Sequence, residues 1–224
     1  MRYEAPQNIA DAVALLAAEK GDARVLAGGT DLLVQLRAGF AEPDLIVDIK
    51  RIDAMHNIVE ENGGYRIGAA VPGAVLGEHD GVVSAWPGVV EGVELIGSTQ
   101  VQGRATMVGN LCNASPAADS VPAMVAADAT VRVFGPGGER EVPVIEICTA
   151  PGKTSLGKDE LIESVYLPAR PANSGDCYLR FIPRTEMDIA VVGAAVALTV
   201  DEAGQLVLQT PKGQVRIPAA DVYF

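Results

Sequence analysis

The sequence predicts an α+β protein with two lobes and a short C-terminal α+β subdomain. Three observations predict it: a helix, strand, glycine turn and helix near the start, short β-prone segments between glycine-rich turns in the middle, and a hairpin pattern near the end. With 224 residues and 49% hydrophobic side chains, the chain can bury at least one full core and has the length at which one domain gives way to two. We expect a small α/β lobe over 1–55, a larger α+β lobe over 56–172 and the subdomain over 176–224.

The first lobe is predicted to begin with an amphipathic helix. Apolar residues recur at helical spacing from Ile9 to Ala17, and Gly21 follows as a helix stop, so we expect this helix over 8–20. The next elements in chain order are a buried strand over 25–27, a tight turn over 28–30, a helix over 32–37 ending at Gly39, and a strand over 45–49.

The larger lobe is predicted to be mainly antiparallel, because its β-prone segments are short and joined by turn residues. We expect strands over 58–60, 65–68, 130–134, 141–144 and 162–167, with helices near 86–96 and 120–127. Pro168, Pro171 and Gly175 then predict a linker. The apolar runs 189–200 and 205–209, on either side of the turn 201–204, predict a hairpin that starts the subdomain.

Charge and cysteine content exclude several classes of function. A net charge of −12 disfavours nucleic acid and anionic membranes as partners, since both require a cationic surface. No run reaches the ~18 apolar residues of a spanning helix, and the start lacks the order of a signal peptide, so we expect the protein in the cytoplasm. The three cysteines are far apart without a CxxC pair, which argues against a disulfide framework and against a zinc or iron-sulfur site.

A first candidate binding motif is Gly28-Gly29-Thr30, between the predicted strand and helix. Glycines let a ligand approach the main chain, and the following helix start offers unpaired N–H groups to an anion. The motif lacks the Lys of a Walker loop and the third glycine of a Rossmann fingerprint, so a diphosphate that bridges two organic halves fits better. A plain strand-to-helix turn without a ligand is the alternative.

A second candidate motif is the stretch TMVGNLCNASPAAD, residues 106–119, which holds polar and glycine residues but no Lys, Arg or His. Gly109 and Asn110 can offer main-chain and amide donors, and Thr106 a hydroxyl. Asp119 can accept hydrogen bonds from a sugar, although it is equally suited to cap a helix that begins near Ser120. These donors and acceptors suit a dinucleotide, but the stretch alone does not decide between binding and capping.

Together the two motifs resemble those of the FAD-binding medium subunits of the molybdenum hydroxylases, the family of xanthine dehydrogenase and aerobic carbon monoxide dehydrogenase. The resemblance extends over most of the chain. It includes the pattern from Tyr3 to Ala12, the segment PGKTSLGKDELI at 151–162 and the segment FIPRTEMDIAVV at 181–192. One departure is Val108, where the family usually has the first glycine of Thr-x-Gly-Gly-Asn.

The resemblance implies the two-lobed FAD-binding fold of the vanillyl-alcohol oxidase type, with FAD between the lobes. It assigns the pyrophosphate to two segments, Val25, Leu26, Ala27, Gly28, Gly29, Thr30, Asp31 and Leu32, and Thr106, Met107, Val108, Gly109 and Asn110. Ile96 would touch the adenine end and Asp119 the ribityl or ribose region. Leu161 and Ile162 would lie near the flavin ring, with an ordinary buried strand as the alternative.

The resemblance also implies partners. A small subunit with [2Fe-2S] clusters would pass electrons to FAD, a large subunit would hold the molybdenum cofactor, and FAD would reduce NAD, oxygen or a quinone, in a dimer of heterotrimers. Because the flavin carries the chemistry, we expect no catalytic acid or base pair on this chain. Lys153, Arg180 and Arg184 are candidates for a cation beside the flavin.

Two rival interpretations stay open at the level of sequence. The first is a stand-alone flavoenzyme of the same fold, which would need its own acid-base group. The second is an interaction subunit that has lost its cofactor, suggested by Val108 and by a C-terminal subdomain shorter than the family's, whose stretch TPKGQVRIP at 210–218 has no clear counterpart.

Overall fold

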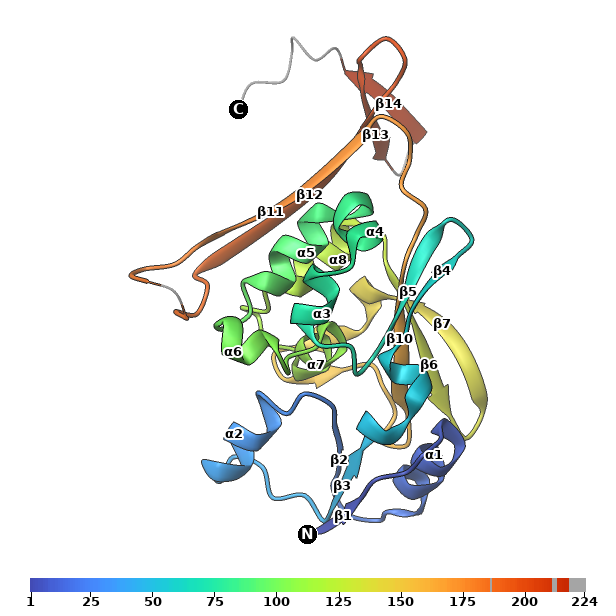
Figure 1. Cartoon of the computed structure of the whole chain (residues 1–224), viewed down its shortest axis with the longest axis vertical. Helices are drawn as coiled ribbons and strands as arrows, with labels where there is room; N and C mark the ends of the chain where they lie inside the picture. The colour runs from blue at the N-terminus through green and yellow to red at the C-terminus, as the bar shows by residue number, and fades with distance from the viewer. Residues whose placement is uncertain (186, 211–212, 218–224) are drawn as a thin grey trace.

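The computed structural model describes residues 1–185, 187–210 and 213–217 and shows a mixed α/β protein (Figure 1). Its three main sheets follow one another along the chain, within residues 2–48, 58–167 and 174–217. The predicted domain boundaries at 55 and 172–176 stay a prediction. No helix in the described ranges is long and apolar enough to cross a membrane.

The first lobe contains a small parallel sheet. Its strands are β1 (Arg2–Glu4), β2 (Ala23–Leu26) and β3 (Leu45–Asp48), in the order β1-β3-β2. The central strand β3 is buried along its whole length, which explains its apolar run. Helix α1 (Ile9–Ala18) begins where Asn8 accepts a hydrogen bond from the main-chain N–H of Asp11, as an N-cap does.

The larger lobe combines a five-stranded antiparallel sheet with a group of short helices (Figure 1). Its strands, in the order β4-β5-β10-β6-β7, are β4 (Ile58–Glu61), β5 (Gly64–Gly68), β10 (Leu161–Leu167), β6 (Thr130–Gly135) and β7 (Gly138–Pro143). Its helices are α3 (Gly73–Gly77), α4 (Asp80–Ala85), α5 (Pro87–Glu94), α6 (Thr99–Gln102), α7 (Met107–Asn113) and α8 (Ser120–Ala126). A two-stranded ribbon, β8 (Cys148–Ala150) with β9 (Lys153–Thr154), lies beside them.

The core of this lobe lies between the sheet and the helices. Val131, Val165 and Leu167 on the sheet and Leu111 and Met124 on the helices are all completely buried. Because α7 and α8 each contribute to this core, their positions relative to the sheet are fixed by packing. The segment that carries the second binding motif is therefore held from behind.

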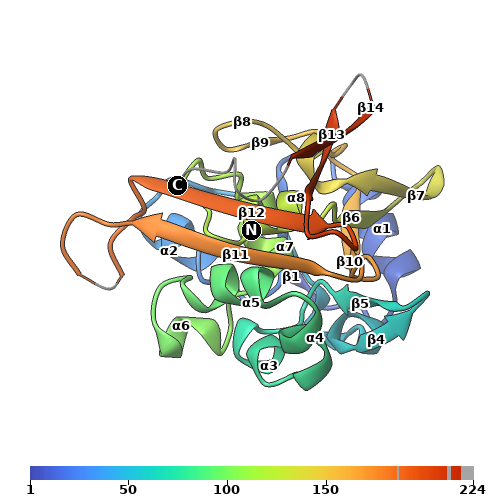
Figure 2. The same ribbon diagram turned by 90° about the horizontal axis from the view of Figure 1, so that it is seen from above.

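The third sheet is a long antiparallel ribbon that crosses helices α5 and α8 (Figure 2). It contains β11 (Ser174–Phe181), β12 (Val192–Val200), β13 (Leu206–Thr210) and β14 (Gly213–Ile217), in that order. The predicted hairpin of β12 and β13 is confirmed, but the longest pairing of β12 is with β11. The predicted linker is correspondingly shorter, because β11 already begins at Ser174. Residues 211, 212 and 218 of the stretch TPKGQVRIP lie outside the described residues.

Candidate functional site: a cavity between the first two lobes

The two predicted binding motifs meet in space at Gly28. A Cβ atom on Gly28 would lie 1.8 Å from the main-chain oxygen of Arg104, just before the second motif. Only glycine permits this approach. The next residue, Gly29, has φ = +79°, a left-handed conformation that favours glycine as well. Each glycine of the first motif thus has its own structural reason, one for contact between the motifs and one for the turn.

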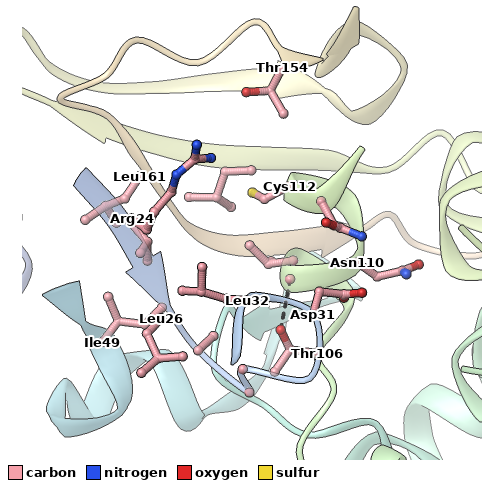
Figure 3. A pocket seen from close by; sticks show the side chains of 18 of the residues that line it. Arg24, Leu26, Asp31, Leu32, Ile49, Thr106, Asn110, Cys112, Thr154 and Leu161 are labelled. Atoms are coloured by element: carbon pink, nitrogen blue, oxygen red, sulfur yellow. Dashed lines mark hydrogen bonds between the residues drawn. The ribbon is translucent and has the colours of Figure 1, made fainter. Parts of the chain in front are cut away.

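A cavity of about 380 Å³ opens where the motifs meet (Figure 3). Of the cofactor-binding residues predicted from the sequence, all but Met107 and Asp119 line this cavity. These lining residues are Val25, Leu26, Ala27, Gly28, Gly29, Thr30, Asp31, Leu32, Ile96, Thr106, Val108, Gly109, Asn110, Leu161 and Ile162. Strand β2, helix α2 (Leu32–Arg37), α7 and β10 therefore contribute to one cavity from both lobes.

The two segments that meet at this cavity each carry main-chain N–H groups without an acceptor in the described chain, at 30–32 and at 107–108, and all of these residues except Met107 line it. The N–H groups of Thr30, Asp31 and Leu32 have no acceptor among the described residues, and neither have those of Met107 and Val108. Unpaired N–H groups at helix starts need a partner from solvent or from a ligand, and an anion suits them. The two motifs can therefore bind one anionic group between them.

The second motif forms the start of a helix, α7, although its glycine and asparagine residues have low helix propensity. Thr106 is the N-cap of α7, since its hydroxyl accepts a hydrogen bond from the main-chain N–H of Gly109 at 2.9 Å. The Thr106 hydroxyl thus has a capping role inside the protein. A Cβ atom on Gly109 would meet only this hydroxyl, at 3.0 Å, so the helix leaves open space there.

Side-chain amides connect the elements around the cavity. Gln35 of α2 donates from Nε2 to Oδ1 of Asn113 on α7, at 2.9 Å. Behind α7, Oδ1 of Asn110 accepts hydrogen bonds from the hydroxyl and the main-chain N–H of Ser120. Lys50 donates from Nζ to the main-chain oxygen of Ala27 at 3.0 Å, which fixes the start of the first motif. None of Gln35, Lys50 and Ser120 belongs to a motif, so sequence reasoning did not find them.

Asp119 is placed behind the cavity, where its carboxylate connects α8 to β11. One oxygen accepts from the hydroxyl of Tyr178 at 2.9 Å and the other pairs with Arg180 at 3.0 Å. Asp119 does occupy the N-cap position of α8, but its side chain makes no capping hydrogen bond. Met107 is buried in the core. Contact of these two residues with a cofactor stays a prediction.

The cations that line the cavity are Arg24 and Lys158 in the described chain, whereas Lys153, Arg180 and Arg184 do not line it. Arg24 is half exposed and pairs with Asp22 at 3.0 Å. Its position on the strand before the glycine turn was the signal that could have identified it.

Two titratable groups at the cavity have raised pKa values. Burial raises the pKa of Asp31, which lies beside the main-chain donors. Burial, and to a lesser extent the neighbouring Cys148, raises the pKa of the Cys112 thiol to about 12.

Apolar side chains complete the lining. Ile96 lies on the loop before α6, while Leu161 and Ile162 lie at the start of β10. Main-chain donors for an anion, together with separate apolar contacts for rings, fit a dinucleotide such as FAD. No group of three or more metal-binding side chains occurs among the described residues.

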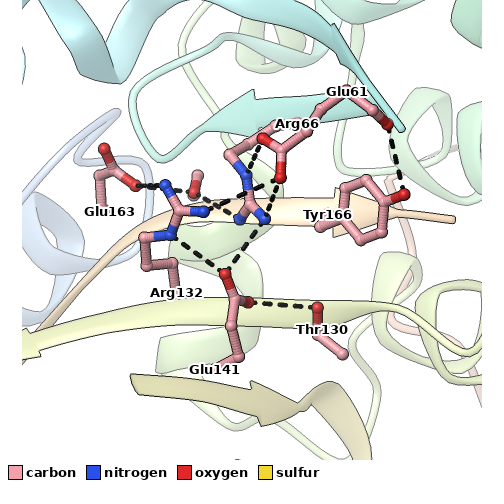
Figure 4. Close-up of polar contacts among 8 residues, drawn as sticks. Glu61, Arg66, Thr130, Arg132, Glu141, Glu163 and Tyr166 are labelled. Atoms are coloured by element: carbon pink, nitrogen blue, oxygen red, sulfur yellow. Dashed lines mark hydrogen bonds and ion pairs between the residues drawn. The ribbon is translucent and has the colours of Figure 1, made fainter. Parts of the chain in front are cut away.

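Away from the cavity, a cluster of charged side chains covers the outer face of the five-stranded sheet (Figure 4). Arg66 binds both oxygens of Glu61, at 2.7 and 2.9 Å, and pairs with Glu141 at 3.1 Å. Arg132 pairs with the same Glu141 at 3.0 Å. The hydrogen bond from Arg66 lowers the pKa of Glu61. Both arginines of the cluster are therefore paired with carboxylates inside the protein.

Comparison with known proteins identifies the relatives of this chain. Residues 1–170 match the family described as "FAD binding domain in molybdopterin dehydrogenase". The chain is 33% identical over 201 residues to the xanthine dehydrogenase FAD-binding subunit of Escherichia coli O157:H7, covering 89% of this chain and 68% of that protein. It is 32% identical over 196 residues to the carbon monoxide dehydrogenase medium chain of Hydrogenophaga pseudoflava, covering 88% and 68%.

Solved structures agree with these sequence matches. The structure superposes on carbon monoxide dehydrogenase from Hydrogenophaga pseudoflava with a TM-score of 0.86 and 29% identity, covering 96% of this chain and 77% of that chain. A second similar structure is quinoline 2-oxidoreductase from Pseudomonas putida 86, with a TM-score of 0.84 and 25% identity, covering 92% and 73%.

Proposed function

This chain belongs to the FAD-binding subunits of the molybdopterin dehydrogenases, and on that premise we propose that it holds FAD in the cavity between its first two lobes and passes electrons through it to a terminal acceptor. It is an oxidoreductase subunit whose cofactor is FAD. Bound FAD supplies the redox chemistry, whereas the protein supplies position and electrostatics. The proposal concerns where FAD lies, which residues hold it and what exchanges electrons with it.

The observation that carries the proposal is the pair of donor sets on the two segments that meet at one cavity. Within the part of the chain that the structure describes, the main-chain N–H groups of 30–32 and of 107–108 have no acceptor, and they belong to segments that touch at Gly28. A pyrophosphate between them would accept hydrogen bonds from both lobes at once. Cofactor binding would then hold the lobes together, because both lobes supply donors.

The lining residues named above would hold the rest of the cofactor. The amide nitrogen of Asn110 adds a side-chain donor beside the main-chain ones. Ile96 on one element and Leu161–Ile162 on another offer apolar contacts to the ring systems.

We extend the proposal to the fold type and to the complex. The two lobes would form the FAD-binding fold of the vanillyl-alcohol oxidase type, supported by a cavity that both lobes line. A small subunit with [2Fe-2S] clusters would deliver electrons, a large subunit would hold the molybdenum cofactor, and NAD, oxygen or a quinone would receive the electrons in the cytoplasm. The names of the relatives, medium chain and FAD-binding subunit, support a place in a larger enzyme.

The visible spectrum of the purified protein tests the proposal. We expect flavin absorption near ~450 nm, a property of the cofactor that the protein positions. Changing Gly29 or Asn110 to a bulky residue should abolish it. Gly137→Leu is the matched control, because a Cβ atom there would meet no atom of the described residues within 4 Å. A colourless folded chain that takes up no added FAD would instead support the cofactor-free interaction subunit.

The electron path needs a second test. In the complex copurified with its partner subunits, substrate of the large subunit should bleach the flavin band before acceptor is added. Bleaching by substrate of the isolated chain would point to the stand-alone flavoenzyme.

A further inference from the structure

Ser120 lies behind the cavity at the start of α8, and both of its hydrogen-bond donors face one atom. Its hydroxyl oxygen is 2.7 Å and its main-chain nitrogen 3.3 Å from Oδ1 of Asn110, and the residue is fully buried. A main-chain N–H can only donate, so the atom that faces it must be the amide oxygen and not the amide nitrogen. Ser120 therefore fixes the orientation of the Asn110 amide.

The fixed oxygen leaves the amide nitrogen of Asn110 free for the cavity. This nitrogen donates to no described residue, and no buried side-chain nitrogen or oxygen of the described residues lacks a partner, so it is accessible. Since Asn110 lines the cavity beside the donors of 107 and 108, the accessible nitrogen adds to the same set. We propose that Ser120 is a positioning residue for FAD, which holds Asn110 with its NH₂ group toward the phosphates. This inference rests on the proposed function.

The position of Ser120 is itself fixed by its neighbour in the chain. Both carboxylate oxygens of Asp119 are bound, one by Tyr178 and the other by Arg180 of β11. All of these side chains are buried or nearly so. The peptide between 119 and 120 is thus anchored from the third sheet, and the Asn110 amide is oriented through it.

Losing the Ser120 hydroxyl would release the amide. The shorter of the two hydrogen bonds disappears, and an amide has nearly the same shape after a half-turn about its terminal torsion. The turned amide would present its oxygen, an acceptor, to the negatively charged phosphates. Affinity for FAD should fall about two- to tenfold, the effect of one hydrogen bond.

FAD titration of the full chain, freed of bound flavin, tests this assignment with a mutant cycle of Ser120→Ala, Asn110→Ala and the double variant. Ser164→Ala is the matched control, because Ser164 is equally buried but lies on the sheet away from the cavity. We expect Ser120→Ala to raise the Kd about two- to tenfold and Ser164→Ala to leave it unchanged. In the Asn110→Ala background, the change at Ser120 should have no further effect, since Ser120 acts through Asn110.

Three outcomes overturn the assignment. Equal Kd values for the unmodified chain and Ser120→Ala would do so, as would additive effects in the double variant, which indicate a general structural role. If Ser120→Ala does not fold, Ser120→Cys replaces it, because a thiol is a weaker donor of similar size. We then expect a smaller rise in Kd, and an unchanged Kd again overturns the assignment. Failure of the unmodified chain to bind FAD would remove the proposed function and this inference together.

Discussion

A methyl group added at Gly28 tests the contact between the two lobes most sharply. In Gly28→Ala the new Cβ atom would start 1.8 Å from the oxygen and 2.6 Å from the carbonyl carbon of Arg104, whereas real Cβ contacts essentially never fall below 3.0 Å. Both neighbouring atoms belong to the main chain, so no flexible side chain can move aside. The first motif must therefore move away from the second.

The expected cost follows from this separation. Overpacking typically destabilises a protein by about 1–3 kcal/mol. In a chain of this size, each 1 kcal/mol lowers the Tm by about 2–4 °C. The free energy of FAD binding should fall by more than the free energy of unfolding. Moving the two motifs apart separates the donors of 30–32 from those of 107–108, so that one pyrophosphate can no longer reach both.

Thermal unfolding with and without FAD measures both effects on one sample. The unmodified chain should gain Tm on addition of FAD, and Gly28→Ala should have a lower Tm and gain little. Gly137→Ala, with nothing within 4 Å of its new Cβ, should behave as the unmodified chain. A Gly28→Ala chain with an unchanged Tm and an unchanged gain from FAD would refute the argument that the motifs meet at this glycine.

Three other substitutions test separate parts of the structure, and a fourth, Arg184→Met, is the control for one of them. Gly109→Leu should weaken FAD binding at least tenfold, about 1.4 kcal/mol, with little change in Tm, because its side chain would enter open space. A fall in Tm that corresponds to a similar loss of folding free energy would contradict this. Arg180→Met should cost about 3–5 kcal/mol of unfolding free energy, since it leaves a buried carboxylate unpaired. Arg184→Met, at an exposed ion pair, should change little. Arg66→Met should remove the acid-sensitive stabilisation by Glu61, whose pKa is depressed below 4.5. In denaturant titrations, the free energy of unfolding of the unmodified chain should exceed that of the variant above pH 4.5, and this difference should shrink as the pH falls. A difference that does not change with pH would exclude the linkage.

Local patterns predicted the regular parts of the fold well. The strand over 45–49 and the helix over 32–37 lie where expected, because one is a fully buried apolar run and the other is bounded by glycines. The first helix ends at Ala18, two residues earlier than expected. Helix α7 and strand β11 were not predicted. The glycine and asparagine of α7 have low helix propensity, and its stability comes from Leu111 in the core and the cap at Thr106.

The sequence predicted the site residues that belong to a motif. It did not predict those that reach the site through tertiary contacts. Gly28 and Gly29 were identified as ligand-approach residues, yet Gly28 is also required by the main chain of Arg104, which no local pattern reveals. Gln35 and Ser120 act on partners 78 and 10 positions away, so only the folded chain shows them. The assignment of Ile96 to the adenine end, and of Leu161 and Ile162 to the flavin ring, stays a prediction.

A crystal structure of the chain with bound FAD tests the central claim most directly. We predict one FAD in the cavity, with its pyrophosphate oxygens within hydrogen-bond distance of main-chain nitrogens from both 30–32 and 107–108. FAD bound elsewhere, or with its phosphates reached from one lobe alone, would contradict the account.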